Sequence, residues 1–498
     1  MAQRPSRVTI VTSTGTRKNM VSLEDQRQRT RTQRSHRNVT EHPSTDFAAS
    51  HGLTTLPWLG TVAKGKSFEL GIQYNRHYGG IVRIAPDLVL VSDAKAVHEI
   101  LVEKDLRKSI IYEKFRQDPK VASILTIRDR PVFRARRRLL ANGFSTQYLK
   151  GLEPQMLGCI QVLEDVLDER CAEGGGETVV NAWNLLGSLT TDIMSETSFG
   201  GSFELVKNGE HPLRERFTKA LKRSSIYQVL PFMKWIFGHA FQDPELKRII
   251  DEIITRRKQL SDEKRGKPDL LALLLDTHEQ HPEVLNYKEV IAEMFVFLIA
   301  GSETSAATMT FALMFLLENP DACQKLVEEI RQRFPAADSP VSEDRMKDLP
   351  FLDAVLKETL RLRPVSAAGF FRQTDEDIVL CGKLLPAGTR MTANTTFLHW
   401  SDEQWPDADR FVPERWLSEY KGKAASEKTA WYPFSAGTRT CIGKQFAWNE
   451  LRLVLVSLLR RYDLSVIPDQ SQELVNFTVL QLKSARYMAG RGTDRHAV

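Results

Sequence analysis

Apolar residues recur at helical spacing along most of the chain. Segments with a period near 3.6 residues predict helices over the ranges 133–143, 152–172, 181–199, 212–224, 244–263, 268–277, 287–318, 320–334 and 350–362. Another amphipathic helix is expected directly after Cys441. Because these segments follow one another without an internal repeat or a strong linker, they indicate one large, mainly helical domain.

Short β-like stretches flank this helical pattern. Residues 81–92 alternate apolar and polar positions around a Pro-Asp turn, which predicts a β-hairpin, and a short helix is expected over 94–103. Further strands are expected near 369–380 and 389–393 and from Leu464 onward. The predicted fold class is therefore α+β, mainly α with small β-sheets.

Most of the net charge of +6 lies at the beginning of the chain. Residues 1–50 contain nine Lys and Arg against four Asp and Glu and lack apolar periodicity, which predicts a disordered basic tail. The remaining residues, 51–498, are nearly neutral and are predicted to form the folded domain. A neutral body gives no electrostatic reason to expect nucleic-acid binding.

The five cysteines argue against a disulfide scaffold. Their number is odd and no pair has C-x-x-C spacing, so a cysteine-rich zinc site is not expected either. A reduced, intracellular compartment fits this pattern. No run approaches the roughly 20 apolar residues that span a bilayer.

Residues 434–443, FSAGTRTCIG, surround one cysteine with unusual residues. Cys441 stands before an amphipathic helix whose positive end favours a thiolate. Gly437 and Gly443 permit close backbone approach to a planar ligand. Phe434 can cover the sulfur, and Arg439 can pair with a carboxylate of that ligand. A buried structural cysteine in a glycine-rich turn is the simpler alternative for an isolated cysteine.

The complete pattern resembles the haem-binding loop of the cytochrome P-450 superfamily, and the resemblance covers essentially residues 50–498. It implies a cytochrome P-450-type domain with a b-type haem and Cys441 as proximal ligand of the iron. Thiolate donation to that iron favours cleavage of the O–O bond of O2.

A second motif, AGSET, spans residues 300–304 of the long apolar segment 287–318. It is similar to the A-G-x-(D/E)-T pattern of the same superfamily. The resemblance implies that Ala300 and Gly301 open a groove for O2 and that Glu303 and Thr304 deliver protons. A core helix kinked by Ser and Thr is the alternative interpretation.

Three charged residues match the structural Glu-Arg-Arg cluster of the superfamily. Glu358 and Arg361 lie in KETLR, and Arg415 lies in FVPERW. Spacing alone places Glu358 and Arg361 on one helix face, where most such pairs are exposed and weak. The resemblance implies a buried network that holds the segment leading to Cys441.

Two further arginines are candidates for binding the haem propionates. Arg137 follows Phe133 by four residues, where the family commonly has a Trp or His before an Arg, and Phe133 cannot donate a hydrogen bond. Arg372 is the second candidate, and His399 matches a further family position. A solvated helix face is the alternative for the basic run around Arg137.

The substrate pocket expected by family position is apolar. Its lining is predicted to include Phe297, Ala367, Ala368, Phe370 and Phe477, together with the loop 109–126 and residues 477–480. This lining suits a lipophilic small molecule. The motifs resemble those of fungal members that modify terpenoids, polyketides or alkaloids in secondary metabolism.

The implied activity is monooxygenation, in which one atom of O2 enters the substrate and the other becomes water. A haem-thiolate isomerase or dehydratase and a non-catalytic haem-binding protein are the alternatives. The Glu303–Thr304 pair argues against the first of these, because those reactions need no proton relay.

The partners implied are an NADPH-dependent reductase and optionally cytochrome b5, since the segment after Cys441 is too short for a flavin domain. A basic docking face is predicted from Arg134, Arg136, Arg138, Lys444 and Arg452. The apolar segment 226–241 either contacts a membrane surface or roofs the pocket. Family analogy implies association with the endoplasmic reticulum membrane, and a cytosolic or mitochondrial location is the alternative.

Overall fold

The computed structural model describes residues 60–491, except for 210–211, 231–232, 234–235, 237–243, 259–267, 337–338, 421–429, 466, 468–469 and 484–486. The predicted basic tail 1–50 therefore lies outside the described residues, as does most of the candidate membrane segment 226–241. Within that segment, Ile236 is described and is 65% exposed.

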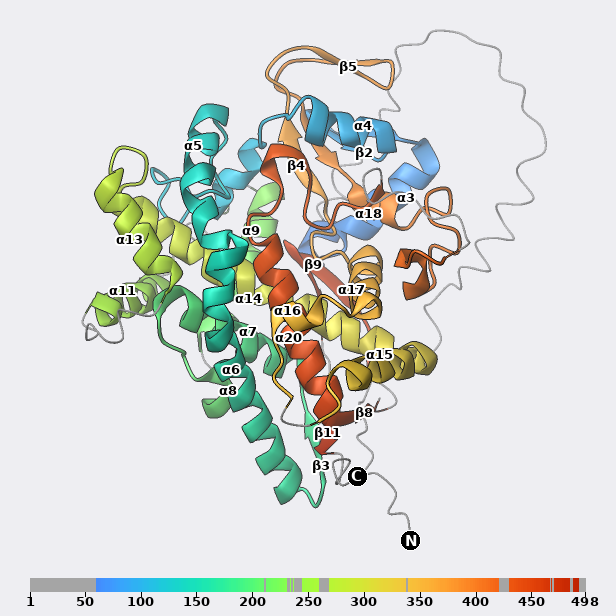
Figure 1. Ribbon diagram of the computed structural model, residues 1–498. Coiled ribbons are helices and arrows are strands. Elements are labelled where there is room, and N and C mark those ends of the chain that lie inside the picture. Colours follow the sequence, from blue (N-terminus) through green and yellow to red (C-terminus); the bar gives the residue numbers. More distant parts are fainter. Residues whose placement is uncertain are drawn as a thin grey trace, which may run out of the picture.

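A single long helix, α14 (Tyr287–Glu318), runs through the middle of the molecule (Figure 1). It begins at a capping box, in which Asn286 accepts from the Glu289 amide while the Glu289 carboxylate accepts from the Asn286 amide. Among the described helices, α14 is long and apolar enough to cross a bilayer, but 72% of its most apolar 18-residue window is buried inside the protein. Here α14 is the central helix of the fold.

The other helices surround α14. Those on the N-terminal side of α14 are α3 (Ser67–Tyr78), α4 (Ala94–His98), η1 (Glu99–Glu103), η2 (Ile110–Phe115), α5 (Arg130–Leu140), η3 (Ala141–Phe144), α6 (Thr146–Glu173), α7 (Ala182–Phe199), α8 (Leu205–Asn208), α9 (Pro212–Val229), α11 (Pro244–Lys258) and α13 (Leu270–Gln280). Those after it are α15 (Pro320–Arg333), α16 (Glu343–Met346), α17 (Pro350–Leu362), α18 (Thr395–His399), η4 (Pro413–Trp416), η5 (Gly437–Arg439) and α20 (Lys444–Arg461).

The strands form small sheets at the edges of the helical body. The largest has the order β1-β2-β7-β4, with β2 and β7 parallel and the other pairs antiparallel. The remaining sheets are β10-β9, β3-β11-β8 and β5-β6. The strand bounds are β1 (Ile81–Ala85), β2 (Leu88–Val91), β3 (Glu177–Val180), β4 (Phe370–Gln373), β5 (Ile378–Leu380), β6 (Lys383–Leu385), β7 (Arg390–Ala393), β8 (Tyr462–Ser465), β9 (Leu474–Phe477), β10 (Val479–Leu482) and β11 (Tyr487–Arg491).

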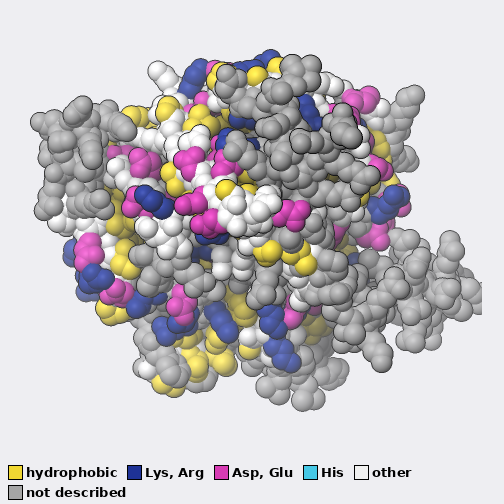
Figure 2. Space-filling model, turned by 90° about the horizontal axis from the view of Figure 1, so that it is seen from below, with side chains coloured by type: hydrophobic (Ala, Val, Ile, Leu, Met, Phe, Trp, Pro, Cys, Tyr) yellow, Lys and Arg dark blue, Asp and Glu magenta, His cyan; other side chains and the backbone are white. Residues whose placement is uncertain are grey.

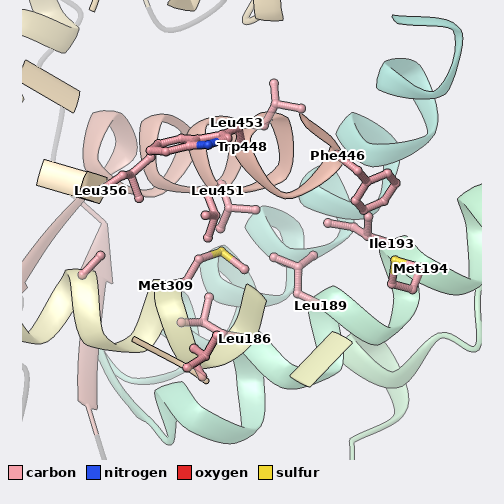
Figure 3. Packing of buried hydrophobic residues seen from close by; sticks show 14 of the residues in the cluster. Leu186, Leu189, Ile193, Met194, Met309, Leu356, Phe446, Trp448, Leu451 and Leu453 are labelled. Atoms are coloured by element: carbon pink, nitrogen blue, oxygen red, sulfur yellow. The ribbon is translucent and has the colours of Figure 1, made fainter. Parts of the chain in front are cut away.

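The main hydrophobic core lies where α7, α14 and α20 meet. Figure 3 shows Leu451 of α20 pointing toward Met309 of α14, with Leu186 of α7 on the far side of Met309 and Leu189 of α7 beside it. Gly301 allows α14 to approach α7 closely, because a Cβ at this position would lie 2.4 Å from the sulfur of Met194. This packing fixes the position of α14 relative to residues 434–443, the cysteine loop, which precede α20.

The architecture confirms the predicted α+β class. The hairpin expected over 81–92 is formed by β1 and β2, and the predicted helices appear with shifted ends. Helix α5 begins three residues before the predicted start, because Asp129 caps it by accepting from the Val132 amide. The helix expected over 94–103 continues as the π-helix η1 after His98.

Charged side chains of both signs are interspersed on the face that Figure 2 shows. Such mixing differs from the single-sign stripe that tracks a nucleic-acid backbone. The visible part of this face therefore gives no support to nucleic-acid binding.

Candidate active site

A cavity of about 440 Å³ lies between α14, the loop before β4, the cysteine loop and the β9–β10 turn. Cys441 lines this cavity together with Ala300, Gly301 and Thr304 of α14. The rest of the wall is mainly apolar. The cavity thus brings the two motifs of residues 300–304 and 434–443 to one place, although more than a hundred residues separate them in the sequence.

The backbone of the cysteine loop is folded tightly against its surroundings. The Cys441 amide donates to the Phe434 carbonyl at 2.9 Å. Gly437 has a φ of +68°, and a Cβ at this residue would lie 2.3 Å from the Leu101 carbonyl oxygen. Only glycine fits both conditions. Gly443 serves a different purpose, because it is the residue directly before α20 and its amide hydrogen-bonds the Cys441 sulfur.

The charge state of Cys441 differs from the expectation for a thiol at a helix N-terminus. Burial raises the pKa of the Cys441 thiol, while the Gly443 amide and the nearby Arg137, Lys108 and Lys444 charges oppose this rise. The helix end alone therefore does not hold a thiolate. A bound metal ion deprotonates a coordinating thiol outright, which supplies the missing stabilisation of the anion.

Four cationic side chains line one part of the cavity wall. They are Lys108, Arg137, Arg372 and Arg439. The four lie close together, since the pKa of Lys108 is held well below its usual range by burial and then by the charges of Arg439, Arg372 and Arg137. Lys108 was not among the predicted site residues, because it lies in an irregular loop and no spacing pattern marks it.

The hydrogen bonds of these cations leave room for an anionic ligand. Arg439 donates to the Arg128 carbonyl at 3.1 Å, and Arg372 donates to the Ser435 hydroxyl at 3.5 Å. Within the described residues, the partners of the four cations are carbonyl and hydroxyl oxygens rather than carboxylates. The Nε atoms of Arg372 and Arg439 are buried without a partner. The two carboxylates of a haem fit this cluster of unpaired donors.

The Phe133 ring packs against two side chains of the cationic cluster, a role that its sequence position did not predict. Its ring is 2% exposed and lies 4.3 Å from the Arg439 guanidinium and 5.1 Å from the Lys108 ammonium. These are cation–π contacts. From the next turn of α5, Arg137 donates to the Thr440 carbonyl at 2.7 Å, which ties α5 to the cysteine loop.

A buried ion pair holds the loop that forms one wall of the cavity. The Ile124 amide donates to both carboxylate oxygens of Glu293, at 2.8 and 2.9 Å. Arg136 contacts Glu293 at 2.8 Å and Glu289 at 2.7 Å, and its side chain is 1% exposed. The prediction that Arg136 belongs to a surface docking face was therefore wrong, because this residue on α5 faces α14 instead of solvent.

The two predicted proton-delivery residues lie on different faces of α14. Thr304 lines the cavity, and its hydroxyl donates to the Ala300 carbonyl at 2.6 Å. Glu303 does not line the cavity, is 2% exposed and lies 3.7 Å from Arg214 of α9. Successive helical residues point about 100° apart, which explains the separation. Burial raises the pKa of Glu303, and Arg214 opposes this rise.

The three residues of the predicted structural cluster meet in the interior. Arg361 forms two hydrogen bonds to Glu358, at 2.8 and 2.9 Å, and Arg415 donates to the same carboxylate at 3.0 Å. Arg361 also donates to the His399 carbonyl at 2.7 Å. The His399 ring accepts from the Tyr432 amide at 2.9 Å, two residues before Phe434. This chain of contacts joins α17 to the cysteine loop.

The apolar wall contains most of the predicted pocket residues. Phe297, Ala367, Ala368 and Phe370 all line the cavity. Phe477 is not among the lining residues, in contrast to the prediction. Its ring lies against Gly65 and 5.4 Å from the Lys222 ammonium. Because side chains alternate along a strand, Asn476 lines the cavity instead of Phe477. Thr478 and Val479, which belong to the predicted range 477–480, line it as well.

Three of the five residues predicted for a docking face are exposed. They are Arg134, Arg138 and Lys444. Arg452 instead forms a two-pronged ion pair with Asp353, with both contacts at 2.7 Å. The remaining face is smaller than predicted but still carries three positive charges near the cysteine loop.

Comparison with known proteins places this geometry in a family. The sequence profile of the family described as Cytochrome P450 matches residues 51–489. Cytochrome P450 monooxygenase acrD of Aspergillus aculeatus is 38% identical over 88% of this chain and 88% of its own length. Cytochrome P450 monooxygenase LUC2 of Fusarium sp is 36% identical over 86% of this chain and 85% of its own length.

A solved structure gives the same result for the fold. The crystal structure of a cytochrome P450, CYP102L1, superposes with a TM-score of 0.74 at 24% identity, covering 87% of this chain and 96% of that chain. Members of the family generally use haem, O2 and electrons from a reductase. The chain belongs to the cytochrome P450 family and is a haem-thiolate monooxygenase.

Proposed function

We propose that this monooxygenase inserts one oxygen atom of O2 into a lipophilic secondary metabolite, such as a terpenoid, polyketide or alkaloid. The observation that carries the proposal is the cavity itself, in which Cys441, four cations and a mainly apolar wall face a common space. The cofactor proposed is haem b, with electrons from NADPH through a separate reductase and optionally cytochrome b5.

Different residues of the cavity have different proposed roles in binding the cofactor. Cys441 would bind the iron, and Arg137, Arg372, Arg439 and Lys108 would hold the two carboxylates. Thiolate-ligated haem, when bound, supplies the chemistry that cleaves the O–O bond of O2.

Proton supply is assigned to α14. The Thr304 hydroxyl donates to the Ala300 carbonyl, so its oxygen stays free to accept a hydrogen bond from the cavity side. Glu303 keeps a raised pKa through burial and contacts Arg214. We assign to Glu303 the exchange of protons with the interior, from a face of α14 that neighbours the face carrying Thr304.

The substrate class follows from the wall and from the relatives. Phe297, Ala367, Ala368 and Phe370 offer apolar surface without charge. Relatives from Aspergillus and Fusarium that are named monooxygenases are 36–38% identical to this chain. An apolar secondary metabolite as the substrate matches both observations.

The absorption spectrum of the reduced, CO-bound protein tests the role of Cys441. We expect the red-shifted Soret band of thiolate-ligated haem in the wild type and its loss in Cys441→Ser. Thr438→Ser is the matched control, because Thr438 belongs to the same loop but does not line the cavity. A wild-type band typical of imidazole-ligated haem would refute the assignment.

Labelled dioxygen separates the enzyme classes. With a reductase, NADPH and a candidate substrate, a monooxygenase transfers one labelled oxygen atom to the product. An isomerase or dehydratase forms product without labelled oxygen, and a non-catalytic haem protein forms none.

We also propose association with the endoplasmic reticulum membrane, with segment 226–241 as the contact; a cytosolic or mitochondrial location is the alternative. The described residue Ile236 is 65% exposed, as a membrane-facing side chain would be. Co-sedimentation with vesicles of neutral phospholipid, compared between wild type and Ile236→Ser, tests this contact. Equal binding of the two proteins would refute it.

A further inference from the structure

Four buried polar atoms without a partner belong to residues that line the cavity, within the part of the chain that the structure describes. They are Nε of Arg372, Nε of Arg439, Oγ1 of Thr392 and Nδ2 of Asn476. Under the proposed function, the haem carboxylates account for the two arginines. They do not account for Thr392 on β7 or for Asn476 on β9.

Of these two residues, Asn476 is the one with a buried amide nitrogen that lacks a hydrogen-bond acceptor. Its side chain is 4% exposed, and its backbone amide donates to the Gly65 carbonyl at 2.8 Å. No hydrogen bond satisfies the side-chain amide nitrogen. Since a buried amide without a partner is costly, an unpaired one calls for a partner from outside the protein, such as a water molecule, an ion or a ligand.

Further polar groups gather beside Asn476. The Ser225 hydroxyl of α9 lies 3.2 Å from the Thr478 hydroxyl of the β9–β10 turn, and both residues line the cavity. Thr478 has a φ of +80°, in the left-handed region that a β-branched residue rarely adopts. Strained backbone of this kind clusters at ligand-binding sites, where the surrounding structure holds it in place.

Ser225, Asn476 and Thr478 form a small polar patch, separate from the four cations, in a wall that is mainly apolar. Two separate elements, α9 and the β9–β10 hairpin, contribute to it. Thr392 contributes a single hydroxyl elsewhere in the sheet. The side chain with an unpaired N–H donor in the patch is Asn476, so the complementary ligand group is a hydrogen-bond acceptor.

We propose that Asn476 is a specificity-determining residue that donates its side-chain amide to a carbonyl oxygen of the substrate. This inference rests on the proposed function, because it takes the cavity as the substrate site. It narrows the substrate class to apolar molecules that carry a ketone, ester or amide carbonyl. The Ser225 and Thr478 hydroxyls would lie beside the same substrate carbonyl, and their contact holds the β9–β10 turn in place.

A pair of probes of equal length tests the proposal on the holoenzyme. The dissociation constants of 2-undecanone and undecane are measured from the spin-state change of the haem, for wild type and Asn476→Leu. We expect the preference for the ketone over the alkane to fall by about 10-fold in the variant, as loss of one buried hydrogen bond implies. Binding of undecane itself should not weaken.

The control is Ser224→Ala. Ser224 is fully buried on α9 and its hydroxyl also lacks a partner, but it does not line the cavity. Its removal should leave the ketone preference unchanged. If Asn476→Leu does not fold, Asn476→Ala serves as the second variant.

Two results overturn the inference. One is a ketone preference that stays within twofold of wild type when Asn476 is replaced, and the other is a wild type that does not respond to 2-undecanone. The CO spectrum of each protein is recorded in parallel. A wild type without the thiolate band refutes the proposed function, whereas a normal band with an unchanged preference refutes only the role of Asn476.

Discussion

Glu450 of α20 is a buried acid whose charge state contributes to the dependence of stability on pH. Its side chain is 0% exposed, and neither carboxyl oxygen has a hydrogen-bond partner of normal geometry. Burial raises the pKa of Glu450 to about 8, against a smaller opposing effect of Ser305 on α14. The folded protein therefore carries this carboxyl in its neutral form at neutral pH.

The magnitude follows from the difference between the folded and unfolded states. The unfolded carboxyl loses its proton above its ordinary pKa of 4.5, whereas the folded one keeps it until about pH 8. Between these values the folded state holds one more proton, so stability falls as pH rises. The fall is about 1.4 kcal/mol per pH unit and reaches at most about 5 kcal/mol over this window.

Glu450→Gln is neutral at every pH and therefore removes this dependence. At about pH 5 we expect the two proteins to be similarly stable, and at about pH 8.5 the variant should be more stable by roughly 3–5 kcal/mol. Urea unfolding of the holoenzyme, followed by tryptophan fluorescence with a reversibility check, measures the difference at each pH.

The exposed residue Glu328 on α15 provides the matched control. Glu328→Gln makes the same chemical change in solvent, so it should produce no comparable gain at high pH. A stability difference between wild type and Glu450→Gln that is the same at all pH values would refute the reasoning, because the folded and unfolded pKa values would then be equal.

Three further predictions concern the site. Glu358→Ala should lower the free energy of unfolding by about 3–5 kcal/mol in urea, because it leaves two buried guanidinium groups without their carboxylate; a loss below about 1 kcal/mol would contradict the buried network. Reversing the charges of Arg134, Arg138 and Lys444 together should slow reduction by the reductase at low salt in stopped-flow measurements, and unchanged rates would rule this face out. Thr304→Val should raise NADPH consumption per product formed, and an unchanged ratio would exclude a role for its hydroxyl in proton supply.

The sequence predicted most of the helices because their apolar faces repeat over many turns. It also predicted the cysteine loop, since glycine, arginine and cysteine occur there at fixed spacing. The same reasoning placed Arg136 on the surface, because the run of three arginines at 136–138 is read as one solvated face. Only the packing of α5 against α14 shows that Arg136 meets Glu289 and Glu293.

Other parts of the site depend on contacts that no local pattern records. Lys108 reaches the cavity from an irregular loop, and its two carbonyl partners, Ile124 and Leu125, lie 16 and 17 residues away. Phe477 was expected in the pocket by family position, whereas the alternation of strand β9 presents Asn476 to the cavity. An error of one residue along a strand therefore replaces an apolar side chain in the predicted cavity wall with a polar one. Sequence position alone does not define which side chains face the cavity.

The hydrogen bond between Arg137 and the Thr440 carbonyl joins residues 303 positions apart in the chain. Closing a loop of that size costs conformational entropy, which the packing between its two ends offsets. We therefore expect the cysteine loop to acquire its geometry late in folding, after α5 and α20 have docked. Binding of haem would then indicate that the whole domain has folded. No fragment that ends before α20 is expected to bind the cofactor.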